Sequence, residues 1–430
     1  MNILKRITVF ILTWEARLVL ARRKPRIVAI TGSVGKTGTK DAIYAALSPS
    51  AYVRKSEKSF NSELGVPLTI LGLQSGWKNP FKWIANIAKG FMLIFWPGRY
   101  PEWLVLEVGA DRPGDIHRIA KRLKTDIVVL TGVPEIPAHV EYFASHEELS
   151  KEKRSLVLSL KPGGTILLNG DDSRMRAMHS EFRALSITFG IEANNNFAAT
   201  HSELMYENGE PTGVRFRMDH EGSSVPVALK GALGRPRIYA ALAAFAVGKV
   251  IGIDFVSISR ALGELAPSPG RLRILKGLKN SVLIDDTYNS SPAACLMALD
   301  TLKEVNGMKR KIAVLGDMLE LGKWSAEAHR KVGERAAQCA DMLITIGFRS
   351  RATVKAALDA GMPEGNIRGY ELNESARAGK ELEWELRDGD LVLIKGSQSM
   401  RMERIVEEVM AEPECARELL VRQDEEWQDR

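Results

Sequence analysis

The sequence predicts an α/β protein made of two domains, each built on a largely parallel sheet. Three observations predict this fold class. Short β-branched runs alternate with helical stretches along most of the chain. The segment APSPGRL (266–272) has the two prolines and the glycine of a hinge. The length of 430 residues, with 45% hydrophobic and 26% charged residues, is ordinary for a globular protein of two or three domains.

The first predicted element is an amphipathic N-terminal helix, placed at residues 1–25. Its apolar run ITVFILTWEARLVL (7–20) is interrupted by Glu15 and Arg17, and no small-residue cleavage site follows it. The uninterrupted run is far shorter than the ~20 residues that span a bilayer. We therefore expect this helix to lie on protein or on a membrane surface.

A central domain is predicted for residues 26–268. A strand at RIVAI (26–30) leads through a glycine-rich turn into a helix at TKDAIYAAL (39–47), which is the repeating unit of a parallel sheet. Further strands are expected at WLVLEVG (103–109), DIVVLTG (126–132) and GGTILLNGD (163–171). Alternating polar and apolar residues between 197 and 230 predict an antiparallel addition to the sheet, and an Ala-rich helix is expected at 237–252.

A C-terminal domain is predicted for residues 269–430. Buried strands are expected at SVLIDD (281–286), KIAVLGD (311–317), DMLITIG (341–347) and DLVLIKG (390–396). This pattern predicts a second doubly wound, Rossmann-like α/β domain. The tail 411–430 holds seven acids and three bases, so we expect it to be a solvated helix end.

Charge and cysteine content exclude some classes of protein. Residues 1–60 hold twelve Lys or Arg against three acids, whereas the rest of the chain is slightly acidic. A uniformly basic nucleic-acid-binding protein would not show this distribution, and no nucleic-acid partner is expected. The three scattered cysteines are too few for a disulfide framework or a zinc site, which favours a reducing, cytoplasmic compartment.

The clearest local motif is Thr31-Gly32-Ser33-Val34-Gly35-Lys36-Thr37, between a predicted strand and a predicted helix. Glycines let backbone amides surround phosphate oxygens, Lys36 can reach the outer phosphates, and the Thr37 hydroxyl can bind Mg²⁺. The usual pattern has a further glycine where this chain has Ile30, so the motif is a shortened phosphate-binding loop, or P-loop. It predicts a nucleotide site formed by Gly32, Ser33, Gly35, Lys36 and Thr37.

This shortened loop resembles that of the ATP-dependent Mur ligases of peptidoglycan synthesis, and the resemblance covers about residues 26–410. Six further segments support it: SFNSELGVP (59–67), LEVGAD (106–111), NGDD (169–172), DDTYNSSP (285–292), LGDMLELG (315–322) and KGS (395–397), together with Gly270-Arg271. Within the family, DDTYNSSP and GDMLELG favour the MurF type.

The resemblance implies an ATP-dependent carbon–nitrogen ligase that joins D-Ala-D-Ala to a muramyl-peptide carboxylate and releases ADP and phosphate. A carboxylate is a poor electrophile, so an acyl phosphate is the expected intermediate, and cations must surround its oxygens. The expected partners are the muramyl peptide and the dipeptide. Two alternatives remain open. One is a ligase of the folylpolyglutamate or cyanophycin synthetase kind on the same scaffold, and the other is a non-catalytic nucleotide-binding protein.

The resemblance also implies metal sites. Thr37 and Glu107 are expected to hold the Mg²⁺ shared by the β- and γ-phosphates, because Mg²⁺ prefers hard oxygen ligands. His139 and Lys153 are expected at a second Mg²⁺, with Lys153 N-carbamylated so that it offers an oxygen ligand. Lys151 is the competing candidate, although the spacing from His139 favours Lys153.

The remaining roles are assigned by the same resemblance. Arg271 is expected at the ATP phosphates, Asp286 at the ribose and Tyr288 near the adenine. Catalytic roles are expected for Lys36, His139, Lys153 and Arg271. Substrate contacts are expected at four further residues: Asn61, Asn289, Lys395 and Ser397.

The sequence departs from the family pattern in two places. Only 25 residues precede the strand of the P-loop, where most members carry a UDP-sugar-binding domain, so we expect that module to be absent. The family signature H-N-x-x-N reads here Pro236-Arg237-Ile238-Tyr239-Ala240, so adenine must be recognised by other groups.

The segment 77–103 is unusually aromatic, with four of the eight tryptophans and several Lys and Arg. This composition is typical of an interfacial helix. One interpretation is a hydrophobic helix packed on the N-terminal helix. The other is a basic, aromatic surface, formed with residues 1–25, for peripheral membrane contact. The protein is expected to be a cytoplasmic monomer, with membrane association under the second interpretation.

Overall fold

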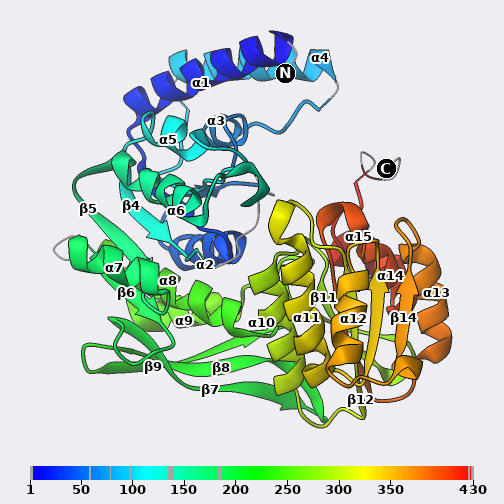
Figure 1. The fold of residues 1–430 in the computed structure, drawn as a ribbon. Helices are drawn as coiled ribbons and strands as arrows, with labels where there is room; N and C mark the ends of the chain where they lie inside the picture. The colour runs from blue at the N-terminus through cyan, green and yellow to red at the C-terminus, as the bar shows by residue number, and fades with distance from the viewer. Residues whose placement is uncertain are drawn as a thin grey trace.

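The computed structural model describes residues 3–57, 60–77, 79–96, 98–133, 140–182, 186–424 and 427, with side chains from residue 7 onward (Figure 1). Two sheets organise these residues, and Figure 1 shows them side by side, the first in blue to green and the second in yellow to red. The expected α/β fold with parallel sheets is confirmed.

The first sheet has nine strands in the order β2-β3-β1-β4-β5-β6-β7-β8-β9. Pairing is parallel from β2 to β7 and antiparallel from β7 to β9, so the antiparallel addition is confirmed. The strands are β1 (Arg26–Thr31), β2 (Val53–Lys55), β3 (Trp103–Glu107), β4 (Thr125–Leu130), β5 (Leu160–Asn169), β6 (Ser186–Gly190), β7 (Phe197–Glu207), β8 (Glu210–His220) and β9 (Ser223–Lys230).

Helices cover both faces of this sheet, because its parallel strands carry apolar side chains on both faces. Val28 and Ile30 of β1 pack in the core with α2 and α8, whereas Ile27 and Ala29 pack on the opposite face with α1, α3 and α5. The helices are α1 (Ile3–Arg23), α2 (Lys36–Leu47), α3 (Gly65–Leu71), α4 (Pro80–Phe95), α5 (Asp115–Ala120), α6 (His146–Arg154), α7 (Ser173–Glu181), α8 (Arg235–Ile251) and α9 (Phe255–Gly263).

The second sheet has the order β10-β11-β15-β12-β13-β14, and β10 is its antiparallel strand. Its strands are β10 (Arg273–Lys276), β11 (Val282–Asp286), β12 (Arg310–Gly316), β13 (Met342–Ile346), β14 (Ile367–Tyr370) and β15 (Asp390–Lys395). Its helices are α10 (Pro292–Glu304), α11 (Ser325–Cys339), α12 (Arg351–Asp359), α13 (Ser375–Glu385), α14 (Glu403–Val409) and α15 (Ala416–Leu419). Two apolar clusters fill its two faces.

Hydrogen bonds join the two sheets close to the predicted hinge. The Leu233 N–H donates to the Leu272 carbonyl at 3.0 Å, and the Ile274 N–H donates to the Gly231 carbonyl at 2.9 Å. The Ser268 hydroxyl donates to Asp41 Oδ2 at 2.8 Å. The carboxyl ends of both sets of parallel strands are thereby held close to one another, which is where ligands bind in open α/β sheets.

The expectation that the tail 411–430 is a solvated helix end is wrong for its described part. Ala416 and Leu420 are buried, and the Arg422 side chain is 5% exposed in an ion pair with Glu403. The acidic composition led to a wrong prediction because Ala416, Leu420 and Arg422, rather than the exposed acids, determine how this segment packs. In the described part of the chain, none of the helices is both long and apolar enough to cross a bilayer.

Candidate functional site

The P-loop connects the end of β1 with the start of α2. Gly35 has φ 83°, a left-handed conformation that glycine adopts without a Cβ clash, and it caps α2. A Cβ on Gly32 would lie 2.0 Å from Thr131 Oγ1, so this position must also be glycine. The Ser33 N–H donates to the Gly132 carbonyl at 2.9 Å and fixes the loop against the end of β4.

Lys36, the first residue of α2, folds back over the loop. Its Nζ donates to the Gly32 carbonyl at 2.9 Å. Burial lowers the pKa of Lys36, and the charge of Glu107 opposes this shift. A half-buried lysine thus lies at the amino end of α2, where the helix dipole also favours an anion.

Glu107 ends β3 beside this loop and is 1% exposed. Thr37 Oγ1 donates to Glu107 Oε2 at 3.0 Å, and Asn61 Nδ2 donates to Glu107 Oε1 at 3.1 Å. Gly109 leaves room for this arrangement, because a Cβ there would lie 2.9 Å from the Asn61 amide. The hydroxyl of Thr37 and the carboxylate of Glu107 therefore form a pair of hard oxygen donors that fits Mg²⁺.

Lys153 and Lys151 lie on α6 in opposite environments. Lys153 is 4% exposed and lines the same cavity as Lys36, whereas the Lys151 side chain is 75% exposed and lies 3.6 Å from Glu147. Burial, together with the charge of Lys36, lowers the pKa of Lys153 to about 7. A large fraction of Lys153 is consequently a neutral amine near neutral pH, the form that reacts with carbon dioxide.

The orientation of α6 is fixed by Glu152, which follows Lys151 and precedes Lys153. Its carboxylate accepts hydrogen bonds from the N–H groups of Gly114, Ile116 and His117 at 2.9, 2.6 and 3.2 Å. Glu152 thereby caps the start of α5 and points the neighbouring Lys153 into the cavity. The Ser145 hydroxyl caps α6 itself by accepting from the Glu148 N–H.

Arg271 reaches this cavity from the other side of the hinge. Its Nη2 donates to Thr37 Oγ1 at 3.3 Å, and its guanidinium lies 3.9 Å from the centroid of the Tyr288 ring. The buried Arg271 Nε has no hydrogen-bond partner among the described residues. An anion between Lys36 and Arg271 would face cations from both halves of the chain.

The structure gathers most of the predicted site residues around one polar cavity. From the predicted set, its walls include Gly32, Ser33, Gly35, Lys36, Thr37, Asn61, Glu107, Lys153, Arg271, Tyr288 and Asn289. His139 lies outside the described residues, so its expected metal role has no structural account here. Among the described residues, no group of three or more His, Cys, Asp or Glu side chains is placed to hold a metal ion.

An apolar cavity adjoins the polar cavity and shares Gly35, Thr37 and Arg271 with it. Its walls are mainly aliphatic, from β9, α8, α9 and the hinge: Leu229, Leu233, Pro236, Ala240, Ala241, Leu262, Leu265, Ala266 and Leu272. Asp286 and Lys395 also line it. An aliphatic slot with a few polar groups suits a planar heterocycle joined to phosphates in the polar cavity.

Asp286 and Lys395 are already paired with each other. Lys395, 2% exposed at the end of β15, donates to Asp286 Oδ2 at 2.6 Å and to the Asn289 carbonyl at 2.9 Å. This ion pair joins β11 to β15 and positions the loop that carries Tyr288 and Asn289. A ligand group that contacts Asp286 would therefore meet a carboxylate that is held in place.

Ser397 lies outside the walls of both cavities. Its hydroxyl accepts from the Leu319 N–H at 2.9 Å, and its N–H donates to the Asp317 carbonyl at 3.1 Å. Asp317 in turn accepts from the N–H groups of Arg349 and Ser350. In this structure, Ser397 and Asp317 hold together the turns that follow β12, β13 and β15.

Two residues near the site, Arg237 and Arg422, have no role predicted from the sequence. Arg237 lines the apolar cavity, at the position where the family signature has asparagine, and its buried Nε has no hydrogen-bond partner among the described residues. The sequence shows that the family signature is replaced at this position, but it does not show that the Arg237 side chain lines this cavity. Arg422 is the second such residue, and it carries no motif.

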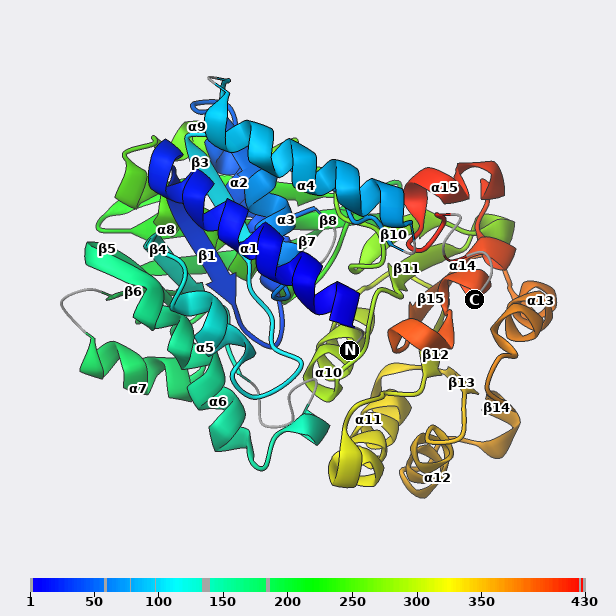
Figure 2. The same ribbon diagram turned by 90° about the horizontal axis from the view of Figure 1, so that it is seen from above.

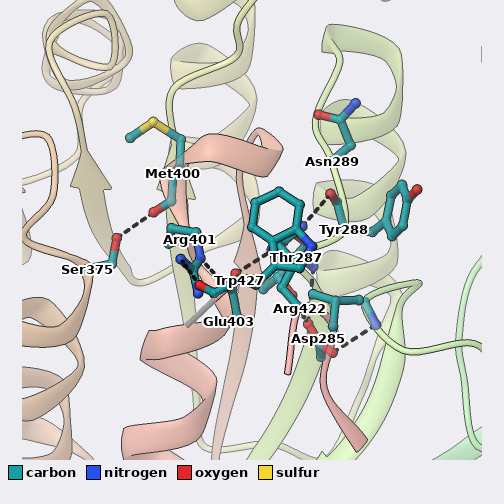
Figure 3. A network of polar contacts seen from close by, with 12 residues as sticks. Asp285, Thr287, Tyr288, Asn289, Ser375, Met400, Arg401, Glu403, Arg422 and Trp427 are labelled. Carbon is teal, nitrogen blue, oxygen red and sulfur yellow. Dashed lines mark hydrogen bonds and ion pairs between the residues drawn. The ribbon is translucent and has the colours of Figure 1, made fainter. Parts of the chain in front are cut away.

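Arg422 ties the C-terminal tail to the loop after β11 (Figure 3). Its Nη2 donates to the Thr287 carbonyl at 2.6 Å and to Glu403 Oε2 at 2.7 Å, and its Nη1 donates to the Tyr288 carbonyl at 3.0 Å. Asp285 holds the same loop from below, accepting from the N–H and hydroxyl of Thr287 and from the Gly270 N–H. The loop that bears Tyr288 is thus fixed by the hinge and by the tail.

Two family models match the chain over most of its length. The model described as Mur ligase middle domain matches residues 30–248, and the model described as Mur ligase, glutamate ligase domain, matches residues 270–398. The first alone covers just over half of the chain.

Curated relatives agree with the family models. The UDP-N-acetylmuramoyl-tripeptide–D-alanyl-D-alanine ligase of Bacillus subtilis is 26% identical over 404 residues, covering 93% of this chain and 79% of the relative. The enzyme of the same name from Escherichia coli is 27% identical, covering 91% and 78%.

Solved structures show the same fold. MurF from Acinetobacter baumannii superposes with a TM-score of 0.75 at 22% identity, covering 92% of this chain and 79% of that one. MurF ligase from Thermotoga maritima in complex with ADP gives a TM-score of 0.74 at 25% identity, covering 93% and 83%. A folylpolyglutamate synthase from Mycobacterium tuberculosis shares the fold at 15% identity, with a TM-score of 0.63.

Proposed function

The chain belongs to the Mur ligase family, and we propose that it is an ATP-dependent ligase of the MurF type that joins D-alanyl-D-alanine to a muramyl-tripeptide carboxylate in peptidoglycan synthesis. The observation that carries this proposal is the convergence of Lys36, Thr37, Glu107, Lys153 and Arg271 around one polar cavity. These residues come from the P-loop, β3, α6 and the hinge. Their combination of cations and hard oxygen donors suits phosphoryl transfer to a carboxylate.

The reaction has two steps. In the first, a carboxylate oxygen of the acceptor peptide bonds to the γ-phosphorus of ATP, the bond to the β-phosphate oxygen breaks, and ADP leaves. In the second, the amino group of the dipeptide attacks the acyl carbon, loses a proton, and expels inorganic phosphate. Lys36 and Arg271 both line the cavity, where they can stabilise the charge that develops on the transferring phosphoryl oxygens.

Magnesium, when bound, would neutralise phosphate oxygens and orient them. Thr37 and Glu107 are the residues that would hold it next to the P-loop, since their oxygens lie 3.0 Å apart. The proposed second site takes His139 and Lys153, with Lys153 as a carbamate. Carbamate formation bonds the neutral amine nitrogen to the carbon of CO₂ and releases one proton, so it converts a cation that repels a metal ion into an oxygen ligand.

For the nucleotide, we propose that the base enters the apolar cavity while the phosphates lie in the polar cavity. Asp286, which lines the apolar cavity, would contact the ribose hydroxyls. Tyr288 lines the polar cavity, so it would contact the nucleotide beside the phosphates rather than a base held in the apolar cavity. Arg237 would supply the polar contact to the base that asparagine supplies in the family signature. This assignment rests on the shared wall of the two cavities, which is formed by Val34, Gly35, Thr37, Arg271, Asn289 and Ala294.

The peptide substrates would approach the polar cavity from the side of Asn61 and Asn289, which both line it. Lys395 and Ser397 would act on the substrates through the loops that they hold, because Lys395 is paired with Asp286 and Ser397 binds the turn at Leu319. We further propose that the enzyme works as a monomer in the cytoplasm, at or near a membrane surface.

Phosphate release with a panel of substrates tests the proposed function. The purified protein is incubated with ATP, Mg²⁺, UDP-linked muramyl tripeptides that differ in their third residue, and D-Ala-D-Ala, and the ligated product is identified by mass spectrometry. We expect phosphate release that requires both the tripeptide and the dipeptide. ATP binding without turnover for any acceptor would instead support the non-catalytic alternative, and turnover with folate and glutamate would support the folylpolyglutamate alternative.

A further inference from the structure

Helices α1 and α4 form a layer on one face of the molecule, away from the second sheet (Figure 1). Seen from above, they run side by side across the first domain (Figure 2). The Arg23 side chain joins them by donating to the carbonyls of Leu93, Trp96 and Gly98 at 3.3, 2.5 and 3.1 Å. These two helices are called the α1–α4 layer below.

The inner face of the layer is packed against the first domain. Leu12, Ala16 and Val19 of α1 are buried there, and so is Ile94 of α4, in one apolar cluster with residues of α3 and α5. Their spacing of three and four residues is that of a single helical face. The layer is thus a fixed part of the fold, and its outer face is free to meet a partner.

The outer face of the layer is strongly apolar. Ten of the twenty large apolar side chains that are exposed among the described residues belong to the layer and its flanks: Ile7, Phe10, Trp14, Trp77, Phe81, Ile84, Phe91, Met92, Phe95 and Trp96. The rings of Trp14 and Phe91 lie 6.1 Å apart and those of Phe91 and Phe95 lie 5.6 Å apart, so the patch continues from one helix to the other. Contiguous apolar patches of this kind mark interaction sites.

Cations surround this patch and exposed acids are missing from it. The segments 7–24 and 79–101 hold seven Lys or Arg and a single acid, Glu15. Glu15 is 0% exposed, while Arg17, Lys82 and Lys89 are exposed on the two helices. The patch therefore offers aromatic side chains and positive charge to the same partner.

Two occupants could cover an apolar face of this size, a second copy of the chain or a bilayer. A symmetric dimer through this face would bring the cations of both copies together, because the same patch meets itself. A bilayer with anionic lipids supplies the opposite charge to the cations and an apolar region to the rings. α4 is hydrophobic but has 16 residues, too few to span a bilayer, so it would lie in the plane of the interface.

We propose that the α1–α4 layer is a peripheral membrane-binding surface that recognises a bilayer containing anionic phospholipid. Its aromatic residues enter the boundary between headgroups and acyl chains, and Arg17, Lys82 and Lys89 contact the headgroup phosphates. The surface involves none of the residues that line the polar and apolar cavities. The proposal consequently stands or falls independently of the ligase reaction.

Vesicle flotation of the full chain tests the aromatic part of the surface. The wild type is mixed with vesicles of phosphatidylcholine alone or of phosphatidylcholine with phosphatidylglycerol. We expect it to float with the mixed vesicles and much less with phosphatidylcholine. The double variant Phe81→Ser/Phe95→Ser should bind the mixed vesicles at least about 10-fold more weakly, since two apolar side chains leave the interface. Phe348→Ser, a 67% exposed phenylalanine remote from the layer, is the matched control and should bind as the wild type does.

A second pair of variants tests the charge. Lys82→Glu/Lys89→Glu should lower binding to the mixed vesicles by about 10-fold or more, and added salt should weaken wild-type binding, while Lys355→Glu on α12 should change neither. Circular dichroism and the midpoint of thermal unfolding serve as folding controls for every variant.

Three results would overturn the proposal: no flotation of the wild type with mixed vesicles, equal flotation of wild type and Phe81→Ser/Phe95→Ser, or a wild-type dimer in sedimentation that the same double variant dissociates. The last result would assign the surface to a second copy of the chain.

Discussion

The polar cavity and the α1–α4 layer each contain a buried glutamate, in very different surroundings. Glu107 is 1% exposed, accepts hydrogen bonds from Thr37 and Asn61, and shares its cavity with Lys36, Lys153 and Arg271. Glu15 is 0% exposed, and neither of its carboxylate oxygens has a hydrogen-bond partner among the described residues. Its Oε2 lies 2.1 Å from where a Cβ on Gly90 would be.

This difference shows that burial alone does not mark a functional carboxylate. Burial raises the pKa of Glu15 to about 7, and desolvation is the cause. Glu15 is therefore largely neutral at moderately acidic pH and acts as a packing group between two helices. Glu107 has donors and cations around it, and only such a carboxylate can help to hold a metal ion with phosphates. Variants at Lys36, Lys153, Glu15 and Arg422 test this contrast.

The largest effect is expected in the polar cavity, at Lys36. Lys36→Met removes the cation that lies over the P-loop and leaves the side chain apolar. Phosphate release in the presence of both substrates should fall at least about 10³-fold, because charge on the transferring phosphoryl group loses a direct contact. Lys121→Met, at an exposed lysine after α5, should keep wild-type turnover. Turnover within a few-fold of wild type in Lys36→Met would remove Lys36 from the catalytic group.

Lys153 and Lys151 provide a matched pair on one helix. Lys153→Ala should lower turnover by about 10² to 10³-fold, since a ligand of the proposed second metal site is lost. Short carboxylates such as acetate should partly restore it by replacing the carbamate oxygens, and ¹³C-labelled bicarbonate should give a carbamate signal in wild type alone. Lys151→Ala should behave as wild type. An equal loss in the two variants, or no rescue, would contradict the assignment.

In the α1–α4 layer the expected effect is on stability and depends on pH. The folded-state pKa of Glu15 is about 7, above its ordinary value of 4.5, so the folded state binds the proton more tightly. The contribution of Glu15 protonation to the free energy of unfolding is therefore complete below about pH 4.5. It is lost as the pH rises through about 7, and the shift limits this loss to roughly 3 kcal/mol.

Glu15→Gln removes the titrating carboxyl group. The free energy of unfolding measured with urea should then depend less on pH between about pH 5 and 8, the range in which Glu15 of the wild type loses its proton. Glu407→Gln, at an exposed glutamate on α14, is the control and should keep the wild-type slope. The same pH dependence in Glu15→Gln and in wild type would show that Glu15 is not the group responsible.

The smallest effect is expected at Arg422, which acts on the polar cavity through the backbone of Thr287 and Tyr288. Arg422→Gln should raise the KM for ATP by about 10-fold, which is ~1.4 kcal/mol, with a smaller change in kcat, because the loop that positions Tyr288 loses its anchor. Arg417→Gln, exposed on α15, should leave both constants unchanged. A fall in thermal stability with KM unchanged would assign Arg422 to folding alone.

Much of the fold and of the site could be predicted from contiguous segments of sequence. The strand, glycine turn and helix around Lys36 define the P-loop because each local signal lies next to the other along the chain. Buried β-branched runs similarly predicted the parallel strands of both sheets. Asn61, Glu107 and Arg271 were identified through motifs, and the structure brings them to one cavity.

Other features depended on contacts between distant residues. The spacing from His139 favoured Lys153 over Lys151, but the contrast between a buried Lys153 and an exposed Lys151 depends on the packing of α6, which Glu152 orients by capping α5. The composition of the tail predicted a solvated segment, but Arg422 donates hydrogen bonds to Glu403 and to two carbonyls of the loop after β11. Ser397 matched a family motif, but its hydroxyl accepts a hydrogen bond from the Leu319 N–H.

The α/β fold class, the P-loop and the family follow from the amino-acid sequence alone, because these depend on residue type and spacing over short stretches. Which charged groups are buried and which are paired depends on the folded chain, because desolvation and hydrogen bonding are set by the residues that folding brings together. Glu15 and Glu107 make this plain: both are glutamates in largely apolar segments, and only the folded chain gives one its donors and leaves the other without them.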